Sequence, residues 1–382
     1  MSSMHHYHPL QNHYVLTQIF KYLTEQRVLY SCVQVSSHWY ASAAPFLYRR
    51  PIPKKLHKFI NTIADAAQHR TLLPYNLMVC EWILADKPNA LFMSQCCSNV
   101  RYICFSKHVF IDESLTEKLL KNWRRLRSIV LQKNATDETL SLIAQHSQSI
   151  ESIEIHGCLV TDNGIRTLLS HCHAINSITI VKCPSITDKT LNALSSAPCT
   201  SILQTLNINE CQFTDSGFAA VSLFPTLHRL SLQALKINSG LLHLAKSVPQ
   251  LEELTFRNMP KLTDNVVATF GKTCRELKRL KLYQCKEING VGVKECKTIV
   301  ELSYFAANME FGELEGICDG CRKIEKLTID AKLHDVGNDE DIICAISQLK
   351  ELKALGLYSG SLISPLDKLK LQKECPNLQK IN

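Results

Sequence analysis

A spaced apolar pattern returns along most of the chain and constrains its fold more than any other feature. Residues 203–216 read LQTLNINECQFTDS, and residues 150–163 read IESIEIHGCLVTDN, with the same order of aliphatic residues, cysteine and Thr-Asp. Written as apolar-x-x-apolar-x-apolar, the pattern begins at eleven positions and ends in a truncated copy at Leu378 and Ile381. The starting residues are Val100, Leu126, Ile150, Ile175, Leu203, Leu227, Leu251, Leu277, Ile299, Ile324 and Leu352.

The intervals between these starts run from 22 to 28 residues, which is the period of leucine-rich repeats, each a short strand with a return segment. One unit cannot bury its apolar edge alone, so neighbouring units stack into a shared core. The sequence therefore predicts an α/β leucine-rich-repeat solenoid over 100–382, with a parallel sheet on the concave side and helices on the convex side. Leu206, Leu230 and Leu254 should then lie on laterally adjacent strands.

Ten of the 17 cysteines fall into two columns of this repeat. Cys158, Cys183, Cys211 and Cys285 lie three residues after the last apolar strand position. Cys97, Cys172, Cys274, Cys296, Cys321 and Cys375 lie three residues before the next repeat. We expect reduced, inward-pointing thiols, because the first residues lack the apolar core of a secretion signal. Cys318 and Cys321 have metal-like spacing, but the column accounts for Cys321 and no second pair has zinc-ligand spacing. No metal or other cofactor is predicted.

Thr-Asp pairs follow several of the predicted strands and precede segments of helical apolar spacing. They are Thr136-Asp137, Thr161-Asp162, Thr187-Asp188, Thr214-Asp215 and Thr263-Asp264. Side chains of Thr and Asp accept hydrogen bonds from the free amides at a helix start. Each unit is thus predicted to run strand, bend, capped helix and return. Its cysteines make it closely resemble the leucine-rich repeats of many F-box proteins.

The segment before the repeats, residues 15–51, has helical spacing of its own. Val15, Leu16, Ile19, Phe20 and Leu23 form one apolar face; Leu29, Cys32, Val33 and Val35 form a second, with Trp39 following. This order resembles the F-box family, whose pattern runs through a helix ending in Ile-Phe-x-x-Leu, a Leu/Cys/Val helix, a Trp and a Leu-Trp/Tyr-Arg ending. The matching elements are Ile19-Phe20-Lys21-Tyr22-Leu23, Leu29-Tyr30-Ser31-Cys32-Val33, Val35, Trp39 and Leu47-Tyr48-Arg49.

The resemblance implies a helical F-box-like domain over 1–50 that docks on a Skp-type adaptor of a cullin-RING (SCF-type) ubiquitin ligase. The implied adaptor-binding residues are Leu16, Ile19, Phe20, Leu23, Leu29, Cys32, Val33 and Trp39. The family's usual opening Leu-Pro has no counterpart near Asn12-His13-Tyr14, which leaves adaptor binding open. Residues 51–99 are predicted to be a helical connection or cap, with an irregular early repeat near Leu77 left open.

Side chains between the apolar strand positions are expected on the concave face. The third position of successive units gives Arg229, Glu253, Arg279, Glu301 and Lys326, which alternate in sign. Because neighbouring strands lie about 4.8 Å apart, opposite charges should stand side by side. The row is open to two interpretations: a self-neutralising ladder, or a ladder that also meets charges on a bound protein.

The seventh position adds aromatic residues, which with Arg are common in interface hot spots. It gives Arg257, Tyr283, Phe305, Asp330 and Tyr358, with Lys281 between the two columns. The predicted substrate-binding residues are Arg257, Arg279, Lys281, Tyr283, Glu301, Phe305 and Tyr358.

Motifs for other functions are missing from the sequence. It contains no G-x-x-x-x-G-K loop, no G-x-S-x-G elbow and no H-E-x-x-H, so an enzyme is not expected. The net charge of +8 comes without interleaved aromatic and basic residues near the N-terminus, so no nucleic-acid role is predicted. No apolar run reaches the length of a membrane span. We expect a cytoplasmic or nuclear substrate-recognition subunit that binds a still unidentified protein; the alternative is a leucine-rich-repeat scaffold or inhibitor without a ligase.

Overall fold

The structure is a computed structural model. It describes residues 10, 12–23, 25–47, 76–79, 87–96, 100–105, 112–219, 224–334, 339–358 and 365–381. The chain divides into two compact units, Met1–Ile153 and Glu154–Asn382. Strand β4 (Ser152–His156) crosses the division in the sequence.

A small helical bundle opens the first unit. Its helices are α1 (His13–Tyr22), α2 (Gln26–Val33) and α3 (Ser37–Leu47). Leu16, Phe20, Leu29 and Ala43 form its buried core, and the rings of Phe20 and Trp39 meet edge to face with centroids 5.5 Å apart. Asn12 is the N-cap of α1, near the place where the F-box family usually has Leu-Pro. The Asn12 side chain accepts hydrogen bonds from the amides of Tyr14 (2.9 Å) and Val15 (3.4 Å).

Strand and helix alternate in the rest of the first unit. The elements are β1 (Asn76–Val79), α6 (Lys87–Cys96), β2 (Tyr102–Phe105), α7 (Glu113–Asn122), β3 (Ser128–Gln132) and α8 (Asp137–His146). Strand β1 pairs in parallel with β2, and β2 with β3. The predicted connection 51–99 thus contains a strand at the position near Leu77 as well as a helix. Residues 51–75, with Cys97, Tyr48 and Arg49, lie outside the described residues.

The second unit repeats the same strand–helix unit. Its strands after β4 are β5 (Ser177–Val181), β6 (Thr205–Asn209), β7 (Arg229–Gln233), β8 (Glu253–Arg257), β9 (Arg279–Tyr283), β10 (Glu301–Glu310), β11 (Lys326–His334), β12 (Ala354–Tyr358) and β13 (Lys380–Ile381). Its helices are α9 (Asp162–His171), α10 (Asp188–Ser196), η2 (Pro198–Ile202), α11 (Asp215–Ala219), α12 (Ser239–Ser247), α13 (Asp264–Thr273), η3 (Val293–Glu295), α14 (Phe311–Gly320), α15 (Asp339–Ser347) and α16 (Pro365–Glu374).

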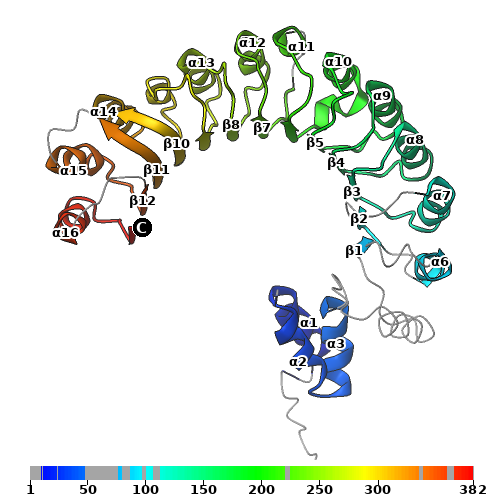
Figure 1. Cartoon of the computed structure of the whole chain (residues 1–382). Helices are drawn as coiled ribbons and strands as arrows, with labels where there is room; N and C mark the ends of the chain where they lie inside the picture. The colour runs from blue at the N-terminus through cyan, green and yellow to red at the C-terminus, as the bar shows by residue number, and fades with distance from the viewer. Residues whose placement is uncertain are drawn as a thin grey trace, which may run out of the picture. The chain divides into compact units, whose positions relative to one another are not determined.

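All strands from β5 to β13 pair in parallel, each with the next along the chain. Leu206 lies opposite Leu230, and Leu230 opposite Leu254, so the predicted register is confirmed. These leucines are buried. Within this unit, the strands line the inner side of an arc and the helices form its outer side (Figure 1). The predicted leucine-rich-repeat solenoid is therefore correct.

A left-handed residue ends most strands. Gly157, Lys182, Glu210, Ala234, Asn258 and Gln284 each follow a strand and have φ between 49° and 62°. This conformation turns the chain away from the sheet after five strand residues. Strands β10 and β11 have no such residue at this point and continue to Glu310 and His334. In the repeats from β4 to β9 this column holds a buried Cys, Leu235 or Met259, whereas after β10 and β11 begin it holds exposed Ala307 and Lys332, which anchor no bend.

The cysteine columns lie inside the solenoid as predicted. Cys183 and Cys211 donate from Sγ to the carbonyls of Ile155 and Ile180 in the preceding repeat. Cys296 and Cys375 of the second column likewise donate to Val267 and Ile346. Cys321 donates to the carbonyls of Val293 (3.2 Å) and Cys296 (3.5 Å). The thiols thus satisfy backbone acceptors of the neighbouring turn.

The Thr-Asp pairs do more than cap their own helices. Thr136, Thr161 and Thr187 accept from amides of the first helical turn, as predicted, whereas Thr263 makes no such bond. The aspartates instead reach the following repeat. Asp162 accepts from the Thr187 amide (2.9 Å), the Thr187 hydroxyl (2.7 Å) and the Thr190 hydroxyl (2.6 Å). Asp188, Asp215 and Asp264 accept in the same way from Thr214, Asn238 and Asn289.

Candidate functional surfaces

The helical bundle separates its predicted adaptor-binding residues into buried and accessible groups. Leu16, Phe20 and Leu29 are at most 3 % exposed. These side chains form the core of the bundle and leave almost no surface for a partner, and their direct contact with an adaptor stays a prediction. Leu23, Cys32, Val33 and Trp39 pack against this core and are partly buried. Ile19, at 42 %, is exposed.

Large apolar side chains are concentrated on the outside of the same bundle. Between residues 14 and 40, seven of them are exposed: Tyr14, Ile19, Tyr22, Val28, Tyr30, Val35 and Tyr40. Tyr22 is 79 % exposed and Val35 61 %. Over all other described residues there are also seven, so the density on the bundle is far higher. This concentration makes the outside of the bundle a candidate interaction surface. The predicted adaptor-binding set includes only Ile19 of these seven, because it consists of apolar positions of the F-box pattern, and Tyr22 and Tyr30 fall between those positions.

The predicted charge ladder on the inner face of the second unit is confirmed in its geometry. Arg229 lies opposite Glu253, Glu253 opposite Arg279, Arg279 opposite Glu301, and Glu301 opposite Lys326. Glu253 accepts from Arg279 Nε at 3.1 Å and from Lys281 Nζ at 3.0 Å, and Lys326 Nζ donates to Glu301 at 2.8 Å. Arg229 donates instead to the Thr205 hydroxyl at 3.1 Å.

Glu253 is the electrostatic centre of this ladder. Burial alone would raise its pKa, but the hydrogen bonds and positive charges of Lys281 and Arg279 outweigh that effect and lower the pKa. The carboxylate therefore stays ionised and fixes two cations on β9. Exposed ion pairs contribute only about 0–1 kcal/mol each, so the ladder mainly orients side chains.

The aromatic column stacks beside the ladder. The guanidinium of Arg257 lies 4.4 Å from the centre of the Tyr283 ring, and the centres of the Tyr283 and Phe305 rings are 4.8 Å apart. Phe305 lies opposite Asp330, and Asp330 opposite Tyr358, which is 45 % exposed. The structure thus places the seven predicted substrate-binding residues on one face of β8 to β12. Whether they bind a substrate stays a prediction.

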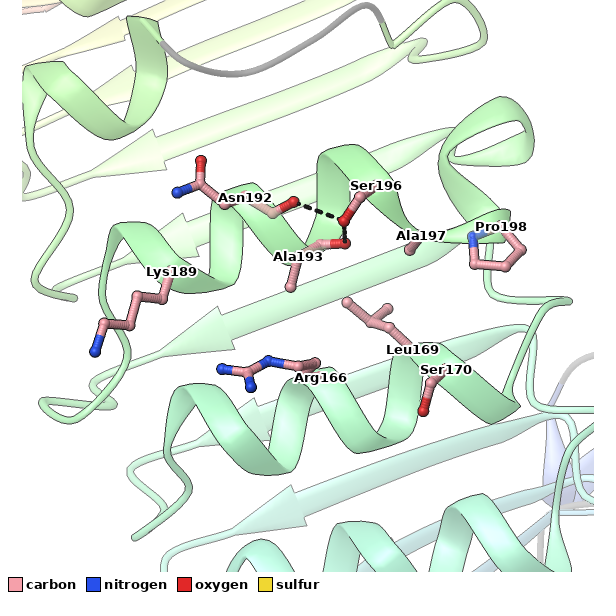
Figure 2. Close-up of a pocket in the computed structure, with 9 residues that line it drawn as sticks. All are labelled: Arg166, Leu169, Ser170, Lys189, Asn192, Ala193, Ser196, Ala197 and Pro198. Carbon is pink, nitrogen blue, oxygen red and sulfur yellow. Dashed lines mark hydrogen bonds between the residues drawn. The ribbon is translucent and has the colours of Figure 1, made fainter.

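A hollow of about 420 Å³ lies on the helical side, between α9 and α10. Figure 2 shows Arg166 of α9 and Lys189 of α10 on the same side of it, with Leu169 and Ala193 between the helices. Among the described residues that line it there is no carboxylate and no histidine. The hollow lies beside η2, in the 28-residue repeat from Ile175 to Leu203.

Groups able to hold a metal ion are not assembled in the part of the chain that the structure describes. Cys318 and Cys321 are both buried, and burial raises the pKa of each thiol to about 12. No described helix has the length and apolarity needed to span a bilayer.

Comparisons with known proteins find matches for the N-terminal helical segment and for the repeats. Residues 13–54 match the F-box-like family. A curated relative, Antagonist of mitotic exit network protein 1 of Saccharomyces cerevisiae, is 23 % identical over 259 residues, which cover 63 % of this chain and 45 % of the relative. The chain thus spans less than half the length of that relative.

Two solved structures share the fold. The yeast complex of Rad7 and Elc1 contains a chain that matches with a TM-score of 0.55 and 11 % identity, over 96 % of this chain and 92 % of that one. The complex of TLR13 with ssRNA13 matches with a TM-score of 0.53 and 16 % identity, over 82 % and 44 %.

Fold and surfaces together describe a leucine-rich-repeat solenoid preceded by a helical bundle that exposes large apolar side chains. The chain thus combines a segment at 13–54 that matches the F-box-like family with leucine-rich repeats that follow it in the sequence.

Proposed function

We propose that this chain is the substrate-recognition subunit of an SCF-type, cullin-RING ubiquitin ligase. The bundle docks on a Skp-type adaptor, and the inner face of the repeats holds a protein substrate in the cytoplasm or nucleus. Other subunits supply the chemistry, and this chain contributes proximity. The observation that carries the proposal is the group of seven exposed apolar side chains on the F-box-like segment. The solved yeast complex of Rad7 and Elc1 supports the proposal, because a chain of similar fold is found there together with a partner protein.

An alanine scan of the exposed bundle residues tests the docking step. Tyr14, Ile19, Tyr22, Val28, Tyr30, Val35 and Tyr40 are changed singly in the full chain, and binding of a purified Skp-type adaptor is measured. We expect at least one variant to lose ten-fold or more in affinity, because a few buried aromatic or aliphatic anchors dominate most interfaces. Leu159→Ala and Val291→Ala serve as controls, since these side chains are 71 % and 50 % exposed but lie in the repeats.

A folded full chain that does not bind the adaptor would favour the alternative, a leucine-rich-repeat scaffold without a ligase. Core variants such as Leu16→Ala cannot decide the question. Loss of binding there reports an unfolded bundle.

A further inference from the structure

Positive charge and aromatic rings gather on one part of the inner face. We use the name basic–aromatic surface for Arg229, Arg257, Arg279, Lys281, Tyr283 and Phe305, from β7 to β10. The inner-face positions of β7, β8 and β9 carry four cations and a single carboxylate, Glu253. The next two strands are different, because Glu301, Glu310 and Asp330 there outnumber Lys326 and Lys332. The surface therefore has an excess of positive charge beside two stacked rings.

Each of these cations is held in place by a neighbour. One carboxylate oxygen of Glu253 accepts a hydrogen bond from Arg279 and the other accepts one from Lys281, so a single negative charge faces two positive charges. Arg257 lies over the Tyr283 ring, which leaves the edge of its guanidinium, with its N–H groups, open to an acceptor. Among the described residues, neither Arg229 nor Arg257 forms an ion pair, and both are exposed. The surface is preorganised for anionic groups.

We propose that the basic–aromatic surface binds an acidic segment of the protein substrate. Asp or Glu side chains pair with Arg229, Arg257 and Lys281, and an aromatic or aliphatic side chain packs against Tyr283 and Phe305. This inference rests on the proposed function, since it names the chemistry of the substrate that the repeats recognise.

The spacing of the cations selects separate carboxylates rather than one phosphate. Arg229 and Lys281 lie two strands apart, roughly 10 Å along the sheet, whereas a phosphate site converges several donors on one group. Arg279 and Lys281 also both form an ion pair with Glu253. A row of acidic residues matches this distribution better than a single phosphorylated residue.

Peptide selection on the intact protein tests the proposal. A library of randomised 12-residue peptides is displayed and selected on the immobilised full chain, and sequences are compared before and after selection. We expect Asp and Glu to be enriched at least two-fold together with an aromatic residue, and Lys and Arg to be depleted. Synthetic copies of the enriched peptides are then titrated by fluorescence anisotropy.

The variants locate the binding site. The double variant Arg257→Glu with Lys281→Glu should lower the affinity for the selected peptides at least ten-fold. The neutral double variant Arg257→Gln with Lys281→Gln should lower this affinity by a smaller factor. The matched control is Arg166→Glu with Lys189→Glu, the same residue types at the hollow in Figure 2, and it should change affinity less than two-fold. Circular dichroism checks that each variant is folded.

Several outcomes overturn the inference. The first is a selected pool that is not enriched in Asp and Glu. The second is loss of peptide binding in the control variant, Arg166→Glu with Lys189→Glu, and not in the Arg257 and Lys281 variants. The third is a set of peptides that bind only when they carry phosphoserine. The adaptor titration is independent. If acidic peptides do not bind while the adaptor does, this inference is wrong and the proposed function still stands. If acidic peptides bind and the adaptor does not, the docking step of the proposed function is wrong and the chemistry of the inner face still stands.

Discussion

At the scale of single residues, aspartates at helix starts connect one repeat to the next. Asp162 is half-buried and accepts three hydrogen bonds from Thr187 and Thr190. Burial by itself would raise its pKa, but these hydrogen bonds outweigh burial and lower it. The sequence predicted a cap within one repeat, whereas the side chain bonds across two. Nothing in the spacing of Thr and Asp distinguishes these alternatives, because the partner amides belong to a helix about 25 residues away.

Asp162→Ala should destabilise the protein by about 1–3 kcal/mol, since it leaves buried donors of Thr187 and Thr190 without an acceptor. The folded pKa is lowered, so this contribution is complete above the ordinary value of 3.8 and is lost as the pH falls through the folded pKa. Urea unfolding at pH 7 and at decreasing acid pH measures both effects. Asp319→Ala, at an exposed carboxylate on α14, should change stability by less than about 0.5 kcal/mol; equal losses in both variants would contradict the cross-repeat role.

Thiol reactivity should follow position in the repeat. Burial raises the pKa of Cys172, Cys211 and Cys274 to about 11, so at pH 8 about one thiol in a thousand is ionised. Cys344 is exposed. Iodoacetamide labelling of the native protein at pH 8, followed by peptide mass spectrometry, should modify Cys344 at least ten-fold faster than these three. Comparable rates in the folded state would show that the column is not enclosed.

At the scale of elements, the strand register could be predicted and the strand ends could not. A period-two apolar pattern fixes which face is buried, because a shift by one residue would expose Leu206, Leu230 and Leu254. The length of β10 and β11 depends instead on a bend that Ala307 and Lys332 do not anchor. The same limit applies to the bundle, where helical spacing marked Leu16 and Phe20 but could not tell core from docking surface.

Close helix approach depends on glycine at the start of α12. A Cβ on Gly240 would collide with the backbone carbonyl of Asp215, whose side chain also accepts from the Gly240 amide at 2.7 Å. Gly240→Ala should therefore destabilise the fold by about 1–3 kcal/mol through overpacking. Gly316→Ala is the matched control inside α14, where a Cβ meets nothing within 4 Å, and it should stabilise by about 0.5–1 kcal/mol. Thermal or urea unfolding that showed the same sign for both would contradict the close approach.

At the scale of the whole molecule, each repeat contacts mainly its neighbours, and stability should be a sum of repeats and interfaces. The fold could be predicted for this reason, since one rule applied at each repeat generates the array. Partner identity could not be predicted, because the exposed side chains of the inner face are not needed for stacking. The sequence already put Arg257, Tyr283 and Lys281 on this face, and the structure adds the contact of Arg257 with the Tyr283 ring and the single carboxylate, Glu253, that Arg279 and Lys281 share.

Nearest-neighbour stacking predicts which pairs of substitutions interact. A Cβ on Gly217 would collide with the Asp188 side chain, which itself accepts from the Thr214 amide at 2.9 Å. Gly217→Ala and Asp188→Ala should each destabilise the protein, but the double variant should lose less than the sum by at least about 0.5 kcal/mol, because the second change removes the clash. The control is the double variant Asp188→Ala with Asp264→Ala, which changes two repeat interfaces that lie several repeats apart. That pair should be additive within about 0.5 kcal/mol in the same urea titrations, and strong coupling in it, or none between Gly217 and Asp188, would show that the repeats do not act as neighbours only.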